Sequence, residues 1–198
     1  MTKHAPETKR REQILVAAGR CIARDGYRGT SVDEIVREAG LSKGAFYWYF
    51  KSKSDVLESL WKERWRAYSA ELRGSELPPS GYRELLAGIT ERILRVHAVK
   101  RGESPVTVEF WAMANQDRRM KRIQAESFRR TREAIGRIVE AGIRRGEIRR
   151  DVDVRGLASQ IQALYNGLIL AHACDAKLPV LRLWRNWVEN LFKGISPR

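Results

Sequence analysis

The amino-acid sequence predicts an all-α protein in which a small N-terminal unit of three helices precedes a larger helical domain. Apolar residues recur every three or four positions through most of the 198 residues, as expected for amphipathic helices. Serine, aspartate, proline and glycine separate these segments at the positions that helix ends prefer. The sequence contains no convincing strand and no internal repeat. We place the two units at residues 1–53 and 54–198.

The first helix is expected over residues 8–25, because Gly26 follows the last apolar position. A shorter helix begins at Ser31, whose side chain can accept from the Glu34 amide while Glu34 reaches back to the Ser31 amide. Gly40 ends this second helix, since glycine tolerates a left-handed exit. The spacing predicts a short helix bounded at both ends.

A third helix begins after Ser42, a natural N-cap, and runs to about Phe50. Phe46 and Phe50 lie one turn apart on its inner side, facing Ile35 and Val36 of the preceding helix. Two short helices joined by a tight turn form a helix-turn-helix unit. The rest of the third helix is left pointing outward.

That outer side is unusual for a solvated surface. It carries three consecutive aromatic residues, and Gly44 costs roughly 1 kcal/mol against alanine. Insertion into the major groove of DNA would justify both features, because glycine lets the backbone approach while lysines and tyrosine hydroxyls reach phosphates or base edges. The alternative is that the aromatic residues cover a junction between domains. The expected DNA contacts are Thr30, Ser31, Ser42, Lys43, Gly44, Ala45, Tyr47, Trp48, Tyr49, Lys51 and Lys53.

Residues 10–57 closely resemble the DNA-binding signature of the tetracycline-repressor (TetR) family of bacterial regulators, most clearly in GTSVDEIVREAGLSKGAFYWYFKSKSDVL. Many members carry histidine where this chain has Tyr49, so the contact there differs. The resemblance implies a transcriptional regulator, most often a repressor, that binds double-stranded operator DNA as a homodimer. The matching residues are Gly26, Thr30, Ile35, Ala39, Gly40, Ser42, Lys43, Gly44, Tyr47, Phe50 and Lys53.

The second unit reads as a succession of longer helices. Ser52 caps a helix that runs to about Leu72 and links the two units. Residues 74–82, GSELPPSGY, are the clearest loop in the chain. Further helices are expected over 81–100, from Ser104-Pro105 to a break at 115–117, from there to about Arg145, from Asp153 onward, and from Leu178-Pro179 onward.

The last two helices are apolar on more than one side, as in IQALYNGLILA at residues 161–171. A monomer would expose this surface, which soluble proteins avoid, so we expect a homodimer interface here. The TetR resemblance implies the same, a four-helix bundle made from the final two helices of each subunit. The alternative is burial within one subunit. The expected interface residues are Ile161, Leu164, Gly167, Leu168, Trp184, Trp187, Val188 and Leu191.

A pocket for a small-molecule effector is expected where the middle helices turn apolar faces inward around a few polar groups. An apolar or aromatic molecule of drug size fits this composition, and the arginines of residues 117–150 make an anionic group compatible with it. The expected lining is Ile89, Ile93, Phe110, Trp111, Met113, Phe128, Ile135, Gln162, Tyr165 and Asn166.

The net charge of +14 favours an anionic partner, but half of the excess lies in residues 117–150, outside the helix-turn-helix. Either these basic residues form a solvated helix face, or they attract DNA or an acidic ligand. The longest apolar run is too short to span a membrane and no signal peptide is recognisable, so we expect a cytoplasmic protein.

Catalysis is not expected. The two cysteines and three histidines fit no metal or redox spacing, and no phosphate-binding loop or cofactor lysine is present, so no cofactor, metal ligand or catalytic residue is assigned. Two alternatives to a specific regulator stay open: a non-specific architectural DNA-binding protein, and a helical enzyme whose site is assembled only in space.

Overall fold

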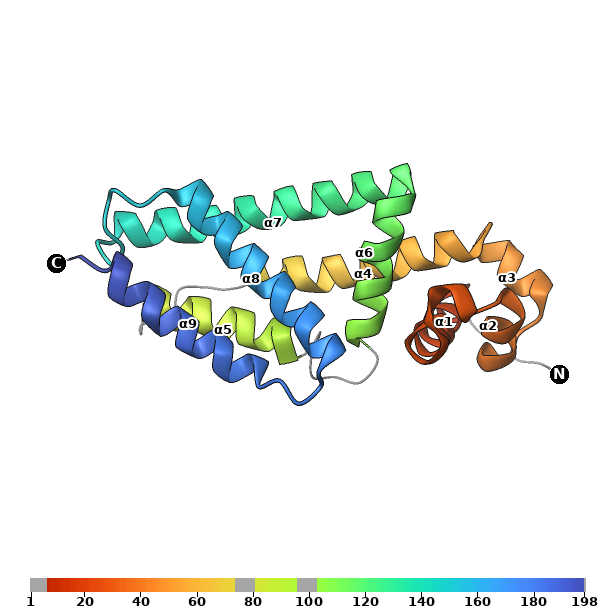
Figure 1. The fold of residues 1–198 in the computed structure, drawn as a ribbon. Coiled ribbons are helices and arrows are strands. Elements are labelled where there is room, and N and C mark those ends of the chain that lie inside the picture. Colours follow the sequence, from red (N-terminus) through yellow and green to blue (C-terminus); the bar gives the residue numbers. More distant parts are fainter. Residues whose placement is uncertain (1–6, 74–80, 96–102, 198) are drawn as a thin grey trace.

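A computed structural model of the chain describes residues 7–73, 81–95 and 103–197. Throughout these three ranges the chain forms helices joined by turns, with no strand (Figure 1), which confirms the all-α prediction. The helices are α1 (Glu7–Gly29), α2 (Val32–Ala39), α3 (Lys43–Tyr49), α4 (Lys53–Arg73), α5 (Tyr82–Leu94), α6 (Glu103–Gln116), α7 (Arg118–Arg144), α8 (Val154–Cys174) and α9 (Val180–Ile195).

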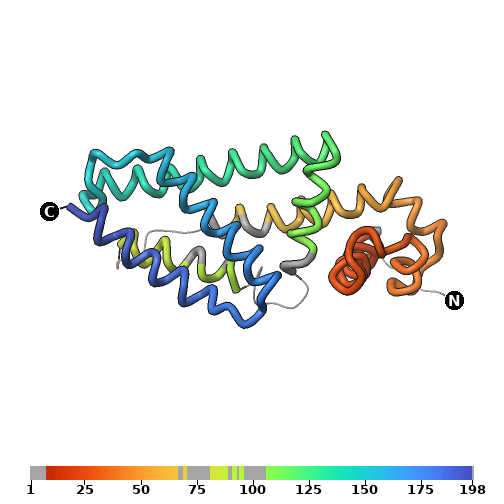
Figure 2. Tube along the Cα trace, in the orientation of Figure 1, coloured from red at the N-terminus to blue at the C-terminus, as the bar shows by residue number. Residues whose placement is uncertain are grey.

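The molecule is elongated, with α1, α2 and α3 at one end and the C-terminus at the other (Figure 2). Helix α4 leads from the three-helix unit into the larger part of the molecule, where it contacts α7. Helix α6 contacts α1, α4 and α7, and therefore lies between the two parts. Helices α5, α7, α8 and α9 build the far end.

The helix ends lie close to where the sequence places them. At the start of α7, the Asp117 side chain accepts from the amides of Arg119 and Met120 at 2.7 and 2.9 Å. After α7, Gly146 adopts a positive φ of 73°. The Asp153 side chain accepts from the Gly156 amide and so caps α8. These local signals therefore set where α7 begins and ends and where α8 begins.

The first helix differs from its prediction. Its assignment runs on to Gly29, although Gly26, the predicted end, does leave helical geometry with φ 73° and ψ 166°. The amide and the hydroxyl of Thr30 both donate to the Gly26 carbonyl, at 3.2 and 2.8 Å, and these bonds hold an extra turn after the break. Helix α6 begins at Glu103, one residue before the predicted cap. Residues 74–80 of the predicted 74–82 loop, and residues 96–100 of the helix predicted over 81–100, lie outside the described residues, while Tyr82 already begins α5.

Three clusters of buried side chains stabilise the fold. One joins α1, α2, α3 and the start of α4, and contains Phe46 and Phe50. A second is shared by α1, α4, α6 and α7, with Ile22, Leu57 and Phe110 among its members. The third fills the far end between α5, α7, α8 and α9. Because the second cluster draws on both parts of the chain, the helix-turn-helix unit is packed directly against the larger part.

None of the helices in the described ranges is both long and apolar enough to cross a membrane.

Candidate functional site

The start of α2 and the turn between α2 and α3 are fixed by features that the sequence predicts. The Ser31 amide donates to the Glu34 carboxylate at 2.6 Å, and the Glu34 amide donates to the Ser31 hydroxyl at 3.2 Å. These bonds to Ser31 hold the pKa of Glu34 below its ordinary value. Gly40 takes up the left-handed conformation, with φ 65°. The Ser42 side chain then accepts from the Ala45 amide and caps α3.

One face of α3 is buried and the other is exposed, as expected. Phe46 has no exposed surface, whereas Tyr47 is 57% and Trp48 76% exposed. Tyr49 is half-buried against the core of the unit. A Cβ added at Gly44 would meet only the Ser42 hydroxyl at 3.8 Å, so packing within the chain does not require glycine there. The aromatic side chains do not cover a junction, because Tyr47 and Trp48 face solvent.

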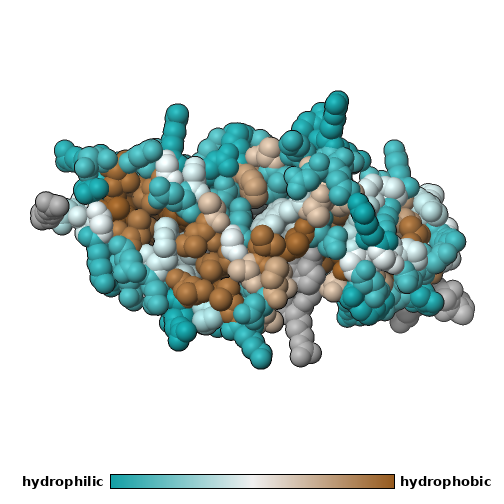
Figure 3. All heavy atoms as spheres, in the orientation of Figure 1, coloured by the Kyte–Doolittle hydropathy of each residue, from teal (hydrophilic) through white to brown (hydrophobic). Residues whose placement is uncertain are grey.

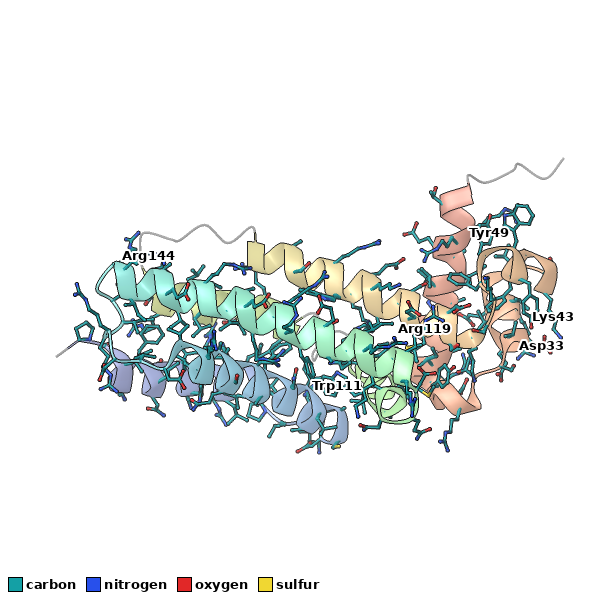
Figure 4. All side chains as sticks on the ribbon, turned by 90° about the horizontal axis from the view of Figure 1, so that it is seen from above. Asp33, Lys43, Tyr49, Trp111, Arg119 and Arg144 are labelled. Carbon is teal, nitrogen blue, oxygen red and sulfur yellow. The ribbon has the colours of Figure 1, made fainter. Side chains whose placement is uncertain are left out.

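Lys43, at the start of α3, forms an ion pair with Asp33 of α2 at 2.7 Å, and both side chains are well exposed (Figure 4). An exposed pair of this kind contributes only about 0–1 kcal/mol, so a phosphate can compete for the ammonium group. The Asp33 carboxylate meanwhile holds the lysine beside the outer face of α3. Ser31, Ser42 and Lys51 are also exposed near this face.

Two of the predicted DNA contacts lie elsewhere. Thr30 is 2% exposed and its hydroxyl donates to the Gly26 carbonyl. The Lys53 ammonium donates to the carbonyls of Tyr27 and Thr30 at 2.6 and 2.5 Å and lies over the Tyr27 ring. Burial lowers the pKa of Lys53. Both side chains therefore hold the end of α1 against the start of α4, which corrects their assignment as phosphate contacts.

A pocket opens between α4, α6, α7 and α8, with about 500 Å³ of empty space including its open mouth. Three indole rings dominate the wall, and hydroxyl, amide and guanidinium groups interrupt it. The full lining is Trp61, Arg64, Trp65, Thr107, Trp111, Ser127, Phe128, Thr131, Gln162, Tyr165, Asn166 and Ile169.

Several polar groups of the pocket are held in place by neighbours. The Trp61 indole N–H donates to the Ser127 hydroxyl at 3.3 Å, and Arg64 donates to the Thr107 hydroxyl at 2.7 Å. Gln162 accepts from Arg132 at 3.0 Å. The indole nitrogen of Trp111 (Figure 4), by contrast, is buried and has no hydrogen-bond partner among the described residues. Within the described ranges it is an unsatisfied donor on a residue of the pocket wall.

The pocket contains five of the predicted lining residues: Trp111, Phe128, Gln162, Tyr165 and Asn166. Phe110 is instead buried in the cluster between the two parts of the chain, where it stacks on Trp61 at 4.3 Å, and Met113 packs against the same cluster. Ile135 is buried at the far end of the molecule. These three assignments are corrected, because the side chains fill core positions. The side chains of Ile89 and Ile93 lie outside the described residues.

The sequence did not reveal the wall that α4 supplies. Trp61, Arg64 and Trp65 lie on a helix that also carries apolar residues to the core of the small unit, so periodicity alone assigns them to packing. Their spacing of three and four residues does place them on one face of α4, and that was the available signal.

The predicted dimer surface is partly buried within one chain. Ile161, Leu168, Trp184 and Val188 pack in the core between α5, α7, α8 and α9, so they offer little surface to a second copy, which corrects their assignment. The remaining apolar surface lies over α8 and α9, where apolar side chains gather (Figure 3). It comprises the exposed Leu170 and Leu183, which the sequence reading missed, and the partly buried Leu164, Trp187 and Leu191, next to the exposed Gly167.

The chain combines a capped helix-turn-helix, whose α3 exposes aromatic side chains, with a larger helical part that contains a pocket. The two parts share a buried cluster. This combination is typical of a ligand-responsive DNA-binding regulator. Comparison with known proteins gives the family. Residues 14–60 match the family described as "Bacterial regulatory proteins, tetR family". Residues 82–193 match "BetI-type transcriptional repressor, C-terminal". The chain belongs to the tetR family of bacterial regulatory proteins, with a C-terminal region of the BetI type.

Individual relatives agree with this family. The chain is 28% identical over 184 residues to the fatty acid metabolism regulator protein of Bacillus subtilis (strain 168), covering 92% of this chain and 94% of that protein. It is 25% identical over 171 residues to the regulator BetI of Vibrio campbellii (strain ATCC BAA-1116), covering 85% of each. The crystal structure of FadR from Bacillus subtilis in complex with stearoyl-CoA superposes with a TM-score of 0.78 at 26% identity, covering 93% of this chain and 99% of that one.

The protein is therefore a DNA-binding transcriptional regulator of a family of ligand-responsive repressors, as the sequence predicted. Regulators of this family bind operators, dimerise and bind small molecules.

Proposed function

We propose that this protein is a repressor that releases its operator on binding a long-chain fatty acyl thioester of coenzyme A. The observation that carries the proposal is the pocket between α4, α6, α7 and α8, where three indole rings, Phe128 and Ile169 give an apolar surface that suits an acyl chain. The regulator FadR of Bacillus subtilis, which is similar over nearly the whole chain, has been crystallised with stearoyl-CoA.

Polar groups in the wall suit the carbonyl end of such a ligand. The buried indole N–H of Trp111 lacks a partner among the described residues and would donate to a thioester oxygen. Arg64 adds positive charge to the same wall, and the described lining contains no carboxylate. The aromatic rings would also suit an organic cation such as a quaternary ammonium group. Arg64 and the missing carboxylate oppose a cation, so the anionic ligand is favoured.

The operator is read by two copies of α3. Lys43, Tyr47, Trp48 and Tyr49 supply contacts from the exposed helix, and Lys51 supplies a contact just beyond it. In a homodimer that pairs through α8 and α9, the two copies of α3 bind the two half-sites of a near-palindrome. The centres of these half-sites lie about 34–36 Å apart.

The test is operator binding measured by fluorescence anisotropy, with DNA from the promoter region upstream of the gene. Palmitoyl-CoA should release the operator, whereas palmitate, free coenzyme A and choline should have little effect at the same concentration. Release by choline alone would replace the acyl thioester with an organic cation. Unchanged operator binding with every compound would refute the proposal.

A pocket variant sharpens this test. Asn166→Trp adds bulk at the pocket wall and should weaken palmitoyl-CoA binding at least about tenfold, or about 1.4 kcal/mol, without changing operator binding. Asn115→Trp is the matched control, because Asn115 is exposed on α6 and is not part of the lining. Equal loss of ligand affinity in both variants would place the ligand outside this pocket.

A further inference from the structure

A strongly basic groove runs beside the pocket, between α4 and α7. It holds about 950 Å³ of space open to solvent, and Trp65 lines both the groove and the pocket. Four cationic side chains and a single carboxylate line it, so the groove suits a multiply charged anion. Its lining is Lys62, Trp65, Arg66 and Ser69 from α4, and Arg130, Glu133, Ala134 and Arg137 from α7.

The acidic side chains near the groove are already neutralised. Glu133 pairs with Arg129 at 2.5 Å, and Glu126 pairs with both Arg129 and Arg130. These two arginines lower the pKa of Glu126 to about 2, so it stays ionised and paired at neutral pH. Arg66 and Arg137 are exposed, and their charges remain for an incoming anion.

Lys62 connects this groove to a chain of ion pairs. Its ammonium lies 2.5 Å from one oxygen of Glu58, a carboxylate on a residue only 5% exposed. The other oxygen of Glu58 lies 2.5 Å from Arg119, at the start of α7, in an ion pair that lacks the geometry of a hydrogen bond. Arg119 also contacts Asp55 at 3.1 Å. Glu58 is thus shared between a groove cation and a cation at the junction with the DNA-binding unit.

This series of contacts ends next to α3. The second oxygen of Asp55 accepts from the backbone amide of Lys51 at 3.1 Å, and Lys51 directly follows Phe50, the C-cap of α3. Figure 4 shows Arg119 at the end of α7 nearest to the helix-turn-helix, with Arg144 at the opposite end. The contacts therefore run without a gap from the groove to the residue after α3.

We propose that this groove binds the phosphate groups of the ligand's head group, and that Lys62 leaves Glu58 for a phosphate and so signals occupancy through Arg119 and Asp55 to α3. The inference rests on the proposed function, since the same ligand places its acyl chain in the pocket and its phosphates in the groove.

The physical cause is competition for one cation. A buried carboxylate that loses a partner is costly, so the oxygen of Glu58 that Lys62 leaves must attract the Arg119 guanidinium nitrogen that now contacts Asp55. Arg119 then holds Asp55 less firmly, and the turn at Lys51 that sets the angle of α3 is loosened. The ligand shifts this equilibrium because it binds more tightly to the state in which Lys62 faces the groove.

The relay is tested first without any ligand, by a double-mutant cycle on operator affinity. Lys62→Gln and Arg119→Gln should each weaken operator binding several-fold, and the double variant should be no weaker than Arg119→Gln alone. Arg129→Gln removes the same charge from α7, where its partners are Glu126 and Glu133 on the same helix, and is the control for general charge loss. The relay would be overturned if the losses of operator affinity in Lys62→Gln and Arg119→Gln multiplied in the double variant. It would also be overturned if each loss were no larger than that of Arg129→Gln.

The groove is tested by direct binding, followed through tryptophan fluorescence. Arg66→Gln with Arg137→Gln should weaken palmitoyl-CoA binding about tenfold and leave palmitate binding unchanged. Unaltered palmitoyl-CoA affinity would exclude the groove as the head-group site. Displacement of palmitoyl-CoA by an equal concentration of inorganic phosphate would overturn the head-group assignment in favour of a free anion.

The two proposals fail in different ways. If palmitoyl-CoA does not bind the wild-type protein, the ligand and the groove are both wrong, while the ligand-free cycle still decides the relay. If palmitoyl-CoA releases the operator from wild type and from Arg119→Gln equally readily, the proposed function holds and the relay is refuted.

Discussion

Lys53 shows how the position of one residue changes its role. In the sequence it lies just past the reading helix, among lysines suited to phosphate contacts. In the structure its ammonium is directed inward and donates to the carbonyls of Tyr27 and Thr30. The Tyr27 carbonyl belongs to the last turn of α1 and the Thr30 carbonyl directly follows that helix, where carbonyl groups lack helical partners.

We predict that Lys53→Met lowers the free energy of unfolding by about 1–3 kcal/mol, because two carbonyls lose a charged donor. The salt dependence of operator binding should stay unchanged, since the ammonium already donates to two backbone carbonyls. Urea unfolding and operator titrations at several salt concentrations measure the two quantities, with Lys51→Met as the exposed control. If Lys53→Met instead reduced the salt dependence of operator affinity and left the free energy of unfolding unchanged, Lys53 would be a phosphate contact after all.

At the scale of single elements, α3 combines a firm cap with a weak interior. Ser42 caps the helix, Phe46 anchors it, and Gly44 destabilises it without any close contact to explain the missing side chain. Helices chosen for stability alone would carry alanine there. Packing within the chain therefore does not explain the glycine, and we expect that close approach of DNA to the outer face of α3 does.

Gly44→Ala is accordingly expected to raise the free energy of unfolding by up to about 1 kcal/mol and to weaken operator binding at the same time. Gly88→Ala in α5 is the matched control, because an added Cβ there meets only the Arg92 side chain at 3.7 Å. Thermal unfolding and operator anisotropy measure both effects. Operator affinity that rises with stability would show that DNA does not approach α3 at this position.

The capping box of α2 predicts a dependence on pH. Glu34 has a pKa below its ordinary value of 4.5 because Ser31 hydrogen-bonds to the ionised carboxylate. A lowered pKa in the folded state gives stability that is present above 4.5 and is lost as the pH falls through the folded value. Glu34→Gln should therefore be less stable than wild type at neutral pH and nearly equal to it at low pH. Thermal unfolding at both pH values checks this, and a difference that persists in acid would contradict it.

At the scale of the whole molecule, we expect the apolar surface over α8 and α9 to be buried in an interface. Leu170 and Leu183 are 46% and 39% exposed, and they lie on helices whose other faces form the core of the same chain. A second copy paired about a two-fold axis would bury both helices against their equivalents.

Leu170→Glu with Leu183→Glu should dissociate the homodimer and weaken operator binding, because each half-site alone binds weakly. These exposed positions should leave the fold intact, unlike a charge at the buried Leu168. Analytical ultracentrifugation and circular dichroism report the two properties. A variant that remains dimeric would move the interface away from these leucines.

Much of the helical layout was predictable because its signals are local. Caps at Ser31, Ser42, Asp117 and Asp153 act within one turn of the backbone, so no distant residue is needed to interpret them. The pocket was less predictable. Phe110 and Phe128 share the same character in sequence, yet one stacks on Trp61 in the core and the other lines the pocket.

The sequence by itself determined the all-α fold, the capped helix-turn-helix and the exposed aromatic face of α3, since spacing and short-range hydrogen bonds specify all three. Only the tertiary structure decided that Lys53 faces inward, that α4 supplies a wall of the pocket, and that Glu58 lies between Lys62 and Arg119. The physical reason is that burial and ion pairing depend on which helices come together. Residues 58 and 119 meet because α4 packs against α7, and no local pattern encodes that contact.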